Sequence, residues 1–245
     1  MNRNSSNEMS RPFEYLFFAD PGELARAAAN AWLDEIERAN RAGKTHCVAL
    51  SGGRIALDFF TAAVEQARRR SVSFDRVHFF WADERCVPPS DPESNFKLAN
   101  ELLLAPLQIP EDRVHRLRGE EAPEAAVKTA GAELRRVTGG AALDLIFLGM
   151  GEDGHVASLF PGAPAGTGGD EGPFLFVDHS PKPPPRRISM SYGAIAAAQG
   201  VWVLVSGPGK EAAFRESLKP DGRTPLARVL RLHPGTKIFS NLGLD

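Results

Sequence analysis

Short apolar runs and longer amphipathic runs alternate along this sequence. The apolar runs are typical of strands buried on both faces, and the amphipathic runs are typical of helices that bury one face. This pattern predicts strands at residues 13–18, 46–53, 76–84, 143–149, 201–207 and 236–240, and two further extended pieces, split by prolines, within 174–190. It predicts helices at residues 20–40, 54–70, 93–104, 122–137, 208–218 and 224–232. Within the helix at 54–70, the spacing predicts a buried face made of Leu57, Phe60, Val64 and Ala67.

The alternation of strands and helices predicts the fold class. Apolar strands joined by amphipathic helices favour an α/β fold, in which a mostly parallel, Rossmann-like sheet carries helices on both faces. In open sheets of this kind, ligands bind outside the carboxyl ends of the strands. The residues that follow the predicted strands are therefore the first candidates for a functional site.

Composition and charge exclude several classes of protein. The chain has 245 residues and a formal net charge of -2, which gives no broad positive surface for nucleic acid. No apolar run reaches the roughly 20 residues that a membrane-spanning helix needs. Two cysteines are too few for a disulfide framework, and no spacing of His, Cys and carboxylates indicates a metal site.

The ends and loops of the chain give expectations about its organisation. Residues 1–12 are polar and lack a secretory signal, so we expect them to be a disordered lead-in to a single domain at 13–245. We expect the protein to be a cytoplasmic monomer. Residues 161–173 are rich in glycine and proline, so we expect a mobile loop there.

The turn after the strand at 46–53 has features of an anion site. Ser51, Gly52 and Gly53 precede Arg54 at the start of a predicted helix. Glycines let backbone N–H groups approach an anion, and the helix N-terminus adds partial positive charge. A tight turn without a ligand fits these residues equally well.

A second charged turn follows the strand at 76–84. Asp83 and Arg85 leave an apolar run, and the planar guanidinium of Arg85 could hold a phosphate or carboxylate. The alternative is a salt bridge at the end of the strand.

The third turn, "LGMGEDGHVASLFPG", carries the strongest candidate for catalysis. Gly151 and its neighbouring glycines permit a sharp turn and leave space for a ligand. His155 is a candidate general base at neutral pH, and Asp153 could orient its imidazole. Lys210, in "SGPGKEAAF", is placed by the pattern in the first turn of a helix, where a bound anion would offset its unfavourable position.

Three segments together resemble the 6-phosphogluconolactonase family. They are "DERCVPPSDPESN", "LGMGEDGHVASLFPG" and "SPKPPPRRISMS", and they occur in the family's order. The resemblance covers the chain from about Phe13 onward. It implies the fold of glucosamine-6-phosphate isomerase and hydrolysis of 6-phospho-D-glucono-1,5-lactone, without a cofactor, in the oxidative pentose phosphate pathway.

The resemblance also implies roles for particular residues. His155 would be the general base that activates water, with Asp153 placing it or the substrate. Residues that would surround the sugar phosphate are Ser51, Gly52, Gly53, Arg54, Asp83, Arg85, Gly151, Arg187 and Lys210. One position departs from the family, which usually shows Ser-Thr-Pro after the two glycines where this chain has Arg54, Ile55 and Ala56.

Two other functions are weighed against the lactonase. Glucosamine-6-phosphate isomerase/deaminase shares the Asp-Gly-His turn but carries an Asn-Glu pair whose carboxylate lies five residues after the histidine. This chain has the apolar pair Leu159 and Phe160 there, which favours hydrolysis. A sugar-phosphate sensor would normally carry a DNA-binding module, and we expect residues 1–12 to be too short for one.

Overall fold

The computed structural model of the protein describes residues 13–140, 142–162 and 172–244. Its strands are β1 (Phe13–Phe17), β2 (His46–Leu50), β3 (Val77–Trp81), β4 (Asp83–Arg85), β5 (Leu145–Gly149), β6 (Phe174–Val177), β7 (Arg187–Met190), β8 (Val201–Val205) and β9 (Thr236–Ser240). Its α-helices are α1 (Pro21–Arg41), α2 (Arg54–Arg70), α3 (Asn95–Ala99), α4 (Pro123–Thr138), α5 (Tyr192–Ala197), α6 (Glu211–Ser217) and α7 (Pro225–Leu232). A π-helical turn covers Asn100–Leu104, and a 3₁₀ turn covers Glu111–Arg113. The expected lead-in at 1–12 and most of the expected loop at 161–173 lie outside the described residues.

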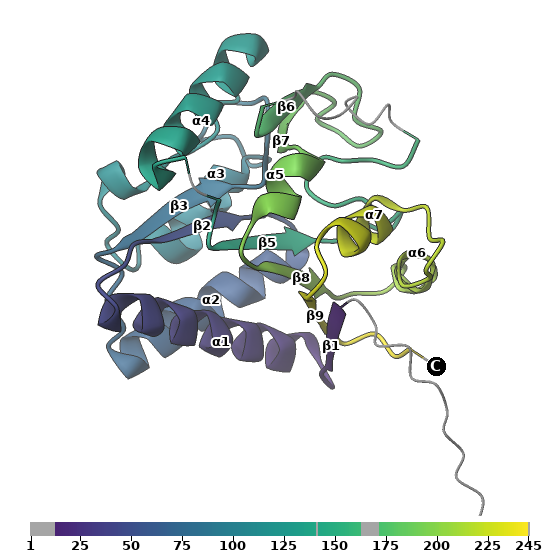
Figure 1. The fold of residues 1–245 in the computed structure, drawn as a ribbon, viewed down its shortest axis with the longest axis horizontal. Helices are drawn as coiled ribbons and strands as arrows, with labels where there is room; N and C mark the ends of the chain where they lie inside the picture. Colours follow the sequence, from purple (N-terminus) through teal and green to yellow (C-terminus); the bar gives the residue numbers. More distant parts are fainter. Residues whose placement is uncertain (1–12, 141, 163–171, 245) are drawn as a thin grey trace, which may run out of the picture.

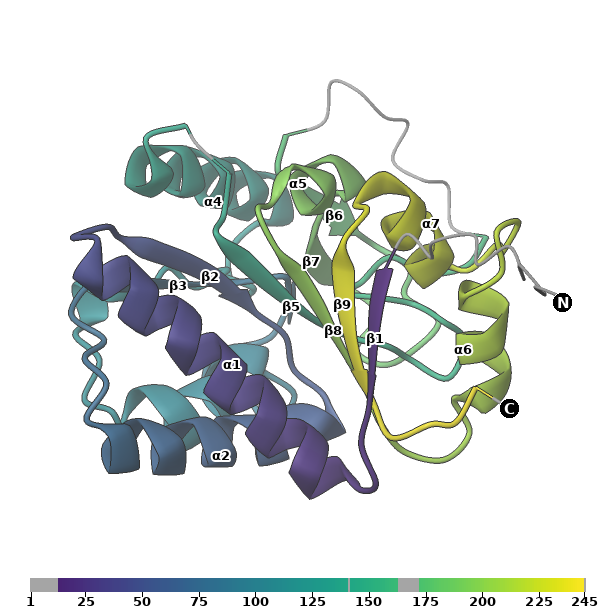
Figure 2. The same ribbon diagram turned by 60° about the horizontal axis from the view of Figure 1, so that its bottom comes forward.

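A six-stranded parallel sheet forms the centre of the molecule. Its strand order is β1-β9-β8-β5-β2-β3, and each neighbouring pair is parallel. Helices α1 and α2 lie together on one face, and α4, α5 and α7 lie on the other (Figures 1 and 2). The prediction of a mostly parallel sheet with helices on both faces is therefore confirmed.

The strand predicted at 76–84 is interrupted, because the chain passes there from one sheet to another. The N–H of Ala82 donates to the Leu50 carbonyl at 2.8 Å, which continues the parallel ladder. Its carbonyl accepts from the N–H of Met190 at 2.7 Å, and β4 then pairs antiparallel with β7. Strands β4, β7 and β6 form a separate three-stranded sheet. The sequence pattern did not predict this second sheet, whose strands have only three or four residues each.

Helix α2 buries most of the predicted face, but not Leu57. Phe60, Val64 and Ala67 are buried as expected, but Leu57 is 44% exposed. The buried stripe is centred on Phe59 and Ala63, which leaves Leu57 at its edge. The ring of Phe59 lies 4.6 Å from that of Phe147 on β5, measured between centroids, so the helix is fixed to the sheet by aromatic packing.

Two further predicted helices need adjustment, and one helix was missed. The helix predicted at 93–104 begins at Asn95 and becomes π-helical from Asn100. Helix α5 was not predicted, since it has only six residues. Helix α6 begins at Glu211, so Lys210 is its N-cap residue and does not lie in its first turn. Across the described part of the chain, no helix is both long and apolar enough to span a bilayer.

Candidate active site

A cleft of about 280 Å³ lies outside the carboxyl ends of β2 and β5. Strands β2 and β5 are neighbours in the sheet. From β2 the sheet continues to β3 on one side, and from β5 it continues to β8 on the opposite side, so the strand order reverses between them. Such a reversal of strand order opens a crevice, which is where open α/β sheets bind ligands. The predicted site residues that line the cleft are Ser51, Gly52, Gly53, Arg54, Asp83, Arg85, Gly151, His155, Arg187 and Lys210.

Asp153 lies behind His155, with which it forms a short hydrogen bond. The Nδ1 of His155 and the Oδ1 of Asp153 are 2.5 Å apart. The same carboxylate oxygen accepts the backbone N–H of His155 at 3.3 Å and lies 3.9 Å from the Nζ of Lys182. A proton on Nδ1 would be held by this bond, which leaves Nε2 as the basic nitrogen.

Close packing fixes the position of the His155 ring. A Cβ on Gly151 would lie 2.1 Å from Nδ1 of that ring, so only glycine fits at this position. The ring of Phe160 packs against the imidazole with a centroid distance of 4.7 Å. The histidine is thereby confined between a glycine backbone and a buried aromatic ring.

The electrostatics of the pair favour a neutral imidazole. Burial lowers the pKa of His155 below its ordinary value, although the carboxylate of Asp153 acts in the opposite direction. Burial raises the pKa of Asp153, but the hydrogen bond and charge of His155 outweigh it and leave that pKa lowered. A neutral His155 beside an ionised Asp153 can accept a proton at neutral pH.

The floor of the cleft is a network around Asp83. Its carboxylate accepts from Oγ of Ser158 at 2.7 Å and from Nδ2 of Asn95 at 3.2 Å, and its side chain is buried. Asn95 also approaches the first turn closely, because a Cβ on Gly52 would lie 2.0 Å from its Oδ1. Gly52 is thus required by the approach of Asn95 from a distant segment of the chain.

Arg85 and Ser51 both have partners within the protein. One Nη of Arg85 donates to the carbonyl of Glu93 at 2.7 Å and lies 3.2 Å from its carboxylate. The Nε of Arg85 is buried and has no hydrogen-bond partner in the described structure. The hydroxyl of Ser51 donates to the carbonyl of Phe147 at 2.8 Å, which ties the first turn to β5.

Arg187 supports the loop that carries Lys182. Its guanidinium is buried and donates to the backbone carbonyls of Lys182, Pro183 and Pro184 at 3.0 to 3.1 Å. It lines the cleft as predicted, but these three side-chain hydrogen bonds all stabilise the loop. Burial and the nearby charge of Arg85 lower its pKa.

Lys210 is a buried cation with no hydrogen-bond or ion-pair partner for its Nζ in the described structure. It is only 7% exposed. Burial, assisted by the charge of Arg54, lowers its pKa to about 8. Partial removal of the Lys210 ammonium from water disfavours its charge, and a bound anion would compensate for that cost.

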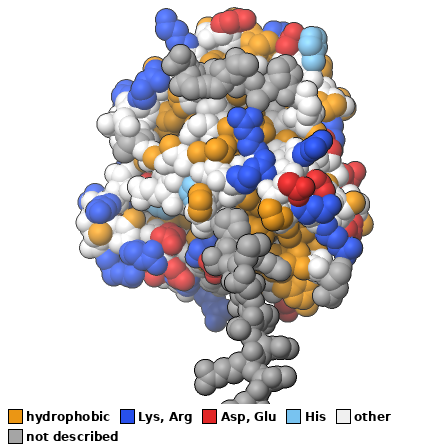
Figure 3. All heavy atoms as spheres, turned by 45° about the vertical axis from the view of Figure 1, so that its right-hand side comes forward, with side chains coloured by type: hydrophobic (Ala, Val, Ile, Leu, Met, Phe, Trp, Pro, Cys, Tyr) orange, Lys and Arg blue, Asp and Glu red, His pale blue; other side chains and the backbone are white. Residues whose placement is uncertain are grey.

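Positive side chains predominate around the cleft. The cations that line it are Arg54, Arg85, Lys182, Arg187 and Lys210, and the acids that line it are Asp83 and Glu152. Strand β5 points to the right in Figure 1, and Figure 3 brings that side of the molecule forward. Lys and Arg side chains gather there beside a few acids (Figure 3). This arrangement suits a small anionic ligand.

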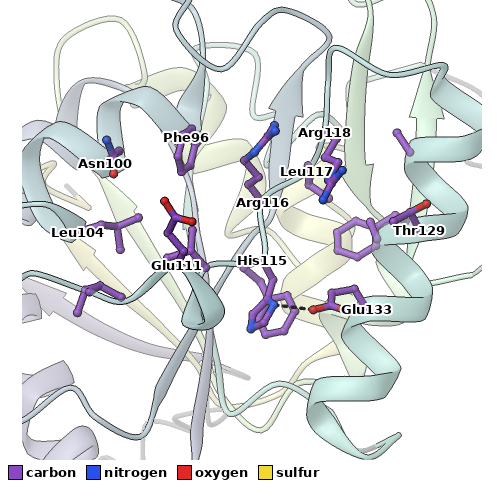
Figure 4. A pocket seen from close by; sticks show the side chains of 16 residues that line it. Phe96, Asn100, Leu104, Glu111, His115, Arg116, Leu117, Arg118, Thr129 and Glu133 are labelled. Atoms are coloured by element: carbon purple, nitrogen blue, oxygen red, sulfur yellow. Dashed lines mark hydrogen bonds and ion pairs between the residues drawn. The ribbon is translucent and has the colours of Figure 1, made fainter.

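A second, larger cavity of about 580 Å³ lies between α4 and the segment that follows α3. His115 and Glu133 form its floor and are joined by a hydrogen bond of 2.8 Å (Figure 4). Arg116, at its rim, is paired with Glu120 through two contacts of 2.6 and 2.9 Å. None of the predicted site residues lines this cavity.

Sequence reasoning missed several residues of the cleft. Asn95 and Lys182 lie within two of the segments that carry the family resemblance, so their segments were identified but their positions were not. Glu152 lies in the third of these segments and was also missed. Among residues 13–140, 142–162 and 172–244, no three His, Cys, Asp or Glu side chains are grouped so as to hold a metal ion.

Comparisons with known proteins bear on the family. A family model described as glucosamine-6-phosphate isomerases/6-phosphogluconolactonase matches residues 19–238. The chain is 35% identical over 197 residues to a 6-phosphogluconolactonase of Aggregatibacter actinomycetemcomitans, which covers 80% of this chain and 81% of that protein.

Solved structures agree with this assignment. The crystal structure of 6-phosphogluconolactonase from Thermotoga maritima matches with a TM-score of 0.78 and 28% identity, over 93% of this chain and 98% of that one. A monomeric glucosamine-6-phosphate deaminase matches with a TM-score of 0.77 over 93% of this chain and 96% of that one, but its 18% identity shows only a common fold. The protein therefore belongs to the glucosamine-6-phosphate isomerase/6-phosphogluconolactonase family.

Proposed function

We propose that this protein hydrolyses 6-phospho-D-glucono-1,5-lactone to 6-phosphogluconate in the oxidative pentose phosphate pathway. The observation that carries the proposal is the His155–Asp153 pair, bonded at 2.5 Å, beside a cleft that also contains Lys210, a cation with no acidic partner among the described residues. The pair supplies a base, and the cations supply a site for the phosphoryl group. The names of the family relatives support the same activity.

In the proposed reaction, His155 acts as a general base. Its Nε2 takes a proton from water while the water oxygen attacks C1 of the lactone. The carbon–oxygen bond of the ring then breaks, and the ring oxygen receives the proton from the imidazolium. Asp153 holds the Nδ1 proton throughout and stabilises the imidazolium when it forms. A positioned base of this kind contributes about 10²–10⁴-fold to the rate.

The cations of the cleft would bind the substrate's phosphoryl group. The Nε of Arg85 is buried and lacks an acceptor, Lys210 is a largely buried lysine whose Nζ pairs with no acid in the described structure, and Lys182 lies beside the proposed base. Binding energy gained at the phosphate would orient the lactone carbonyl, which can contribute several kcal/mol to catalysis. We further propose that Asp83, which lines the cleft, contacts the sugar hydroxyls.

The environment of His155 favours hydrolysis over deamination. The fifth residue after the histidine is Phe160, whose buried ring packs against the imidazole. An apolar ring cannot move protons in sugar ring opening and isomerisation. We therefore prefer the lactonase to the deaminase with which the protein shares its fold.

The proposal includes the setting of the enzyme. We propose that the enzyme acts as a monomer. Both cysteines are free thiols, and burial raises the pKa of Cys47 to about 12. Unpaired cysteines suit a reducing compartment, so we propose that the enzyme acts in the cytoplasm.

The direct test is an assay of the purified protein on freshly generated 6-phosphogluconolactone. Acid release is followed by pH-stat, and the spontaneous rate is subtracted. We expect a rate well above the spontaneous one and no release of ammonia from glucosamine 6-phosphate. A rate equal to the spontaneous one, or release of ammonia, would overturn the proposal.

A further inference from the structure

An ion pair joins the first and third turns at the cleft. The Nη2 of Arg54 lies 3.3 Å from the Oε1 of Glu152, in a single contact between side chains that are 69% and 57% exposed. Arg54 begins α2 after β2, and Glu152 follows β5, so the pair connects the two strand ends that define the cleft. Both residues line it.

The pair lies next to the loop that leads to Lys210. A Cβ on Gly207 would lie 3.9 Å from Nη2 of Arg54, and a Cβ on Gly209 would lie 3.6 Å from Cδ of Glu152. The charge of Arg54 lowers the pKa of Lys210, and the charge of Glu152 acts in the opposite direction. All three charges therefore act within one part of the cleft.

Arg54 occupies a position where a cation is unfavourable without an anion nearby. It is the first residue of α2, a helix of 17 residues with no acidic residue in its first turn and no side-chain hydrogen bond from its N-cap, Gly53. The positive end of a helix repels a cation and attracts an anion. Glu152 supplies that anion from another turn.

The ion pair is weak enough to be exchanged. An exposed pair with one contact contributes little to the stability of a protein. A phosphoryl group carries up to two negative charges and can accept two parallel hydrogen bonds from one guanidinium. Arg54 would therefore gain by leaving Glu152 for a phosphoryl group in the same cleft.

We propose that Glu152 competes with the substrate's phosphoryl group for Arg54. It holds Arg54 at the cleft in the free protein, and Arg54 moves to the phosphoryl oxygens when substrate binds. This inference rests on the proposed function. In this inference Arg54 binds the phosphoryl group, in place of the hydroxyl side chains of the Ser-Thr-Pro that the family usually has here. Glu152 then helps to set the affinity for the substrate.

The test is a double-mutant cycle of Glu152→Gln and Arg54→Met. We expect E152Q to lower KM for 6-phosphogluconolactone, and Kd for 6-phosphogluconate measured by calorimetry, by about two- to fivefold, which is the affinity equivalent of a weak surface pair. We expect R54M to raise both constants. In the R54M background, E152Q should give a clearly smaller gain, because no ion pair remains to be broken.

Controls and contrary outcomes separate this inference from the proposed function. Glu35→Gln removes the acid of another exposed pair, 2.6 Å from Arg38 on α1, and should change neither constant. An equal gain from E152Q with and without Arg54 would show only a general charge effect and overturn the exchange, as would no gain at all. If wild-type protein leaves the lactone at its spontaneous rate, the proposed function fails, and calorimetry with inorganic phosphate still tests the exchange in the same four proteins.

Discussion

The cleft and the second cavity each contain a partly buried histidine bonded to a carboxylate, yet the two histidines are in different situations. His155 bonds Asp153 through Nδ1 at 2.5 Å, and His115 bonds Glu133 through Nδ1 at 2.8 Å. The other ring nitrogen of His115 bonds His78 at 2.8 Å. In the described structure, Nε2 of His155 has no hydrogen-bond partner. Both ring nitrogens of His115 are therefore bonded within the fold, whereas Nε2 of His155 is available to a ligand.

The cations of the two regions differ in the same way. Arg116 at the second cavity forms a two-contact pair with Glu120, which raises its pKa. Lys210 in the cleft has no such partner in the described structure, and its pKa is lowered to about 8. The volume of a cavity is therefore a poorer guide to function here than the bonding capacity left free within it. Four predictions test this difference.

The largest effect is expected from the histidine of the cleft. His155→Ala removes the proposed base, so kcat/KM for 6-phosphogluconolactone should fall by about 10²–10⁴-fold, as measured by pH-stat. The melting temperature should change little, which would show that the fold is intact. Full activity in a correctly folded variant would refute the assignment of the base.

The next largest effect is expected from Lys210→Met. Loss of a charged hydrogen bond of about 1.5–3 kcal/mol should raise KM for the phosphorylated lactone by roughly 10–100-fold. KM for unphosphorylated glucono-1,5-lactone should stay the same. The matched control is Lys219→Met, which removes an exposed lysine that is 2.8 Å from Glu216. Equal weakening of both lactones by K210M would contradict the phosphate assignment.

The pH dependence of kcat/KM should have two limbs. His155 acts as a base only when neutral, so activity should fall as the pH drops through its pKa. Because burial lowers that pKa from the ordinary histidine value of 6.5, this acid limb should lie below pH 6.5. Lys210 binds an anion only when protonated, so activity should also fall as the pH rises through about 8. The K210M variant should lose the alkaline limb and keep the acid one. An unchanged alkaline limb in that variant would assign it to another group.

The smallest effect on activity is expected from the histidine of the second cavity. His115→Ala breaks the bonds to His78 and Glu133, so the free energy of unfolding should fall by about 1–3 kcal/mol. For a chain of this size, each kcal/mol lowers the melting temperature by about 2–4 °C. The kcat/KM should equal that of the wild type. A large loss of kcat/KM without loss of stability would show that the two regions are not distinct in function.

The sequence predicted the parts of the site that follow directly from strands of the main sheet. Parallel strands bring their carboxyl ends to one edge, so Ser51, Asp83, Gly151 and Lys210 could be grouped from the pattern alone. The pattern also separated His155 from the other histidines, because only His155 follows a buried strand within a glycine-rich turn.

The remaining parts depend on long-range packing that local patterns do not record. Lys182 reaches the cleft on a loop that Arg187 holds in place. Asn95 reaches it because its backbone N–H donates to the carboxylate of Glu84 and its side chain donates to Asp83, which together fix the start of α3. The small second sheet was missed because Ala82 connects two sheets within one apolar run. Leu57 was wrongly predicted to be buried, because its spacing fits a stripe with Phe60 and Val64 while the buried face is centred on Phe59 and Ala63.

The central claim is that function lies with the histidine whose second nitrogen is free. The most direct measurement compares H155A and H115A side by side, with kcat/KM on fresh 6-phosphogluconolactone and thermal unfolding recorded on the same preparations. We predict that H155A loses activity and keeps its melting temperature, while H115A keeps its activity and melts earlier. The reverse pattern, or equal loss of activity in both variants, would contradict the account.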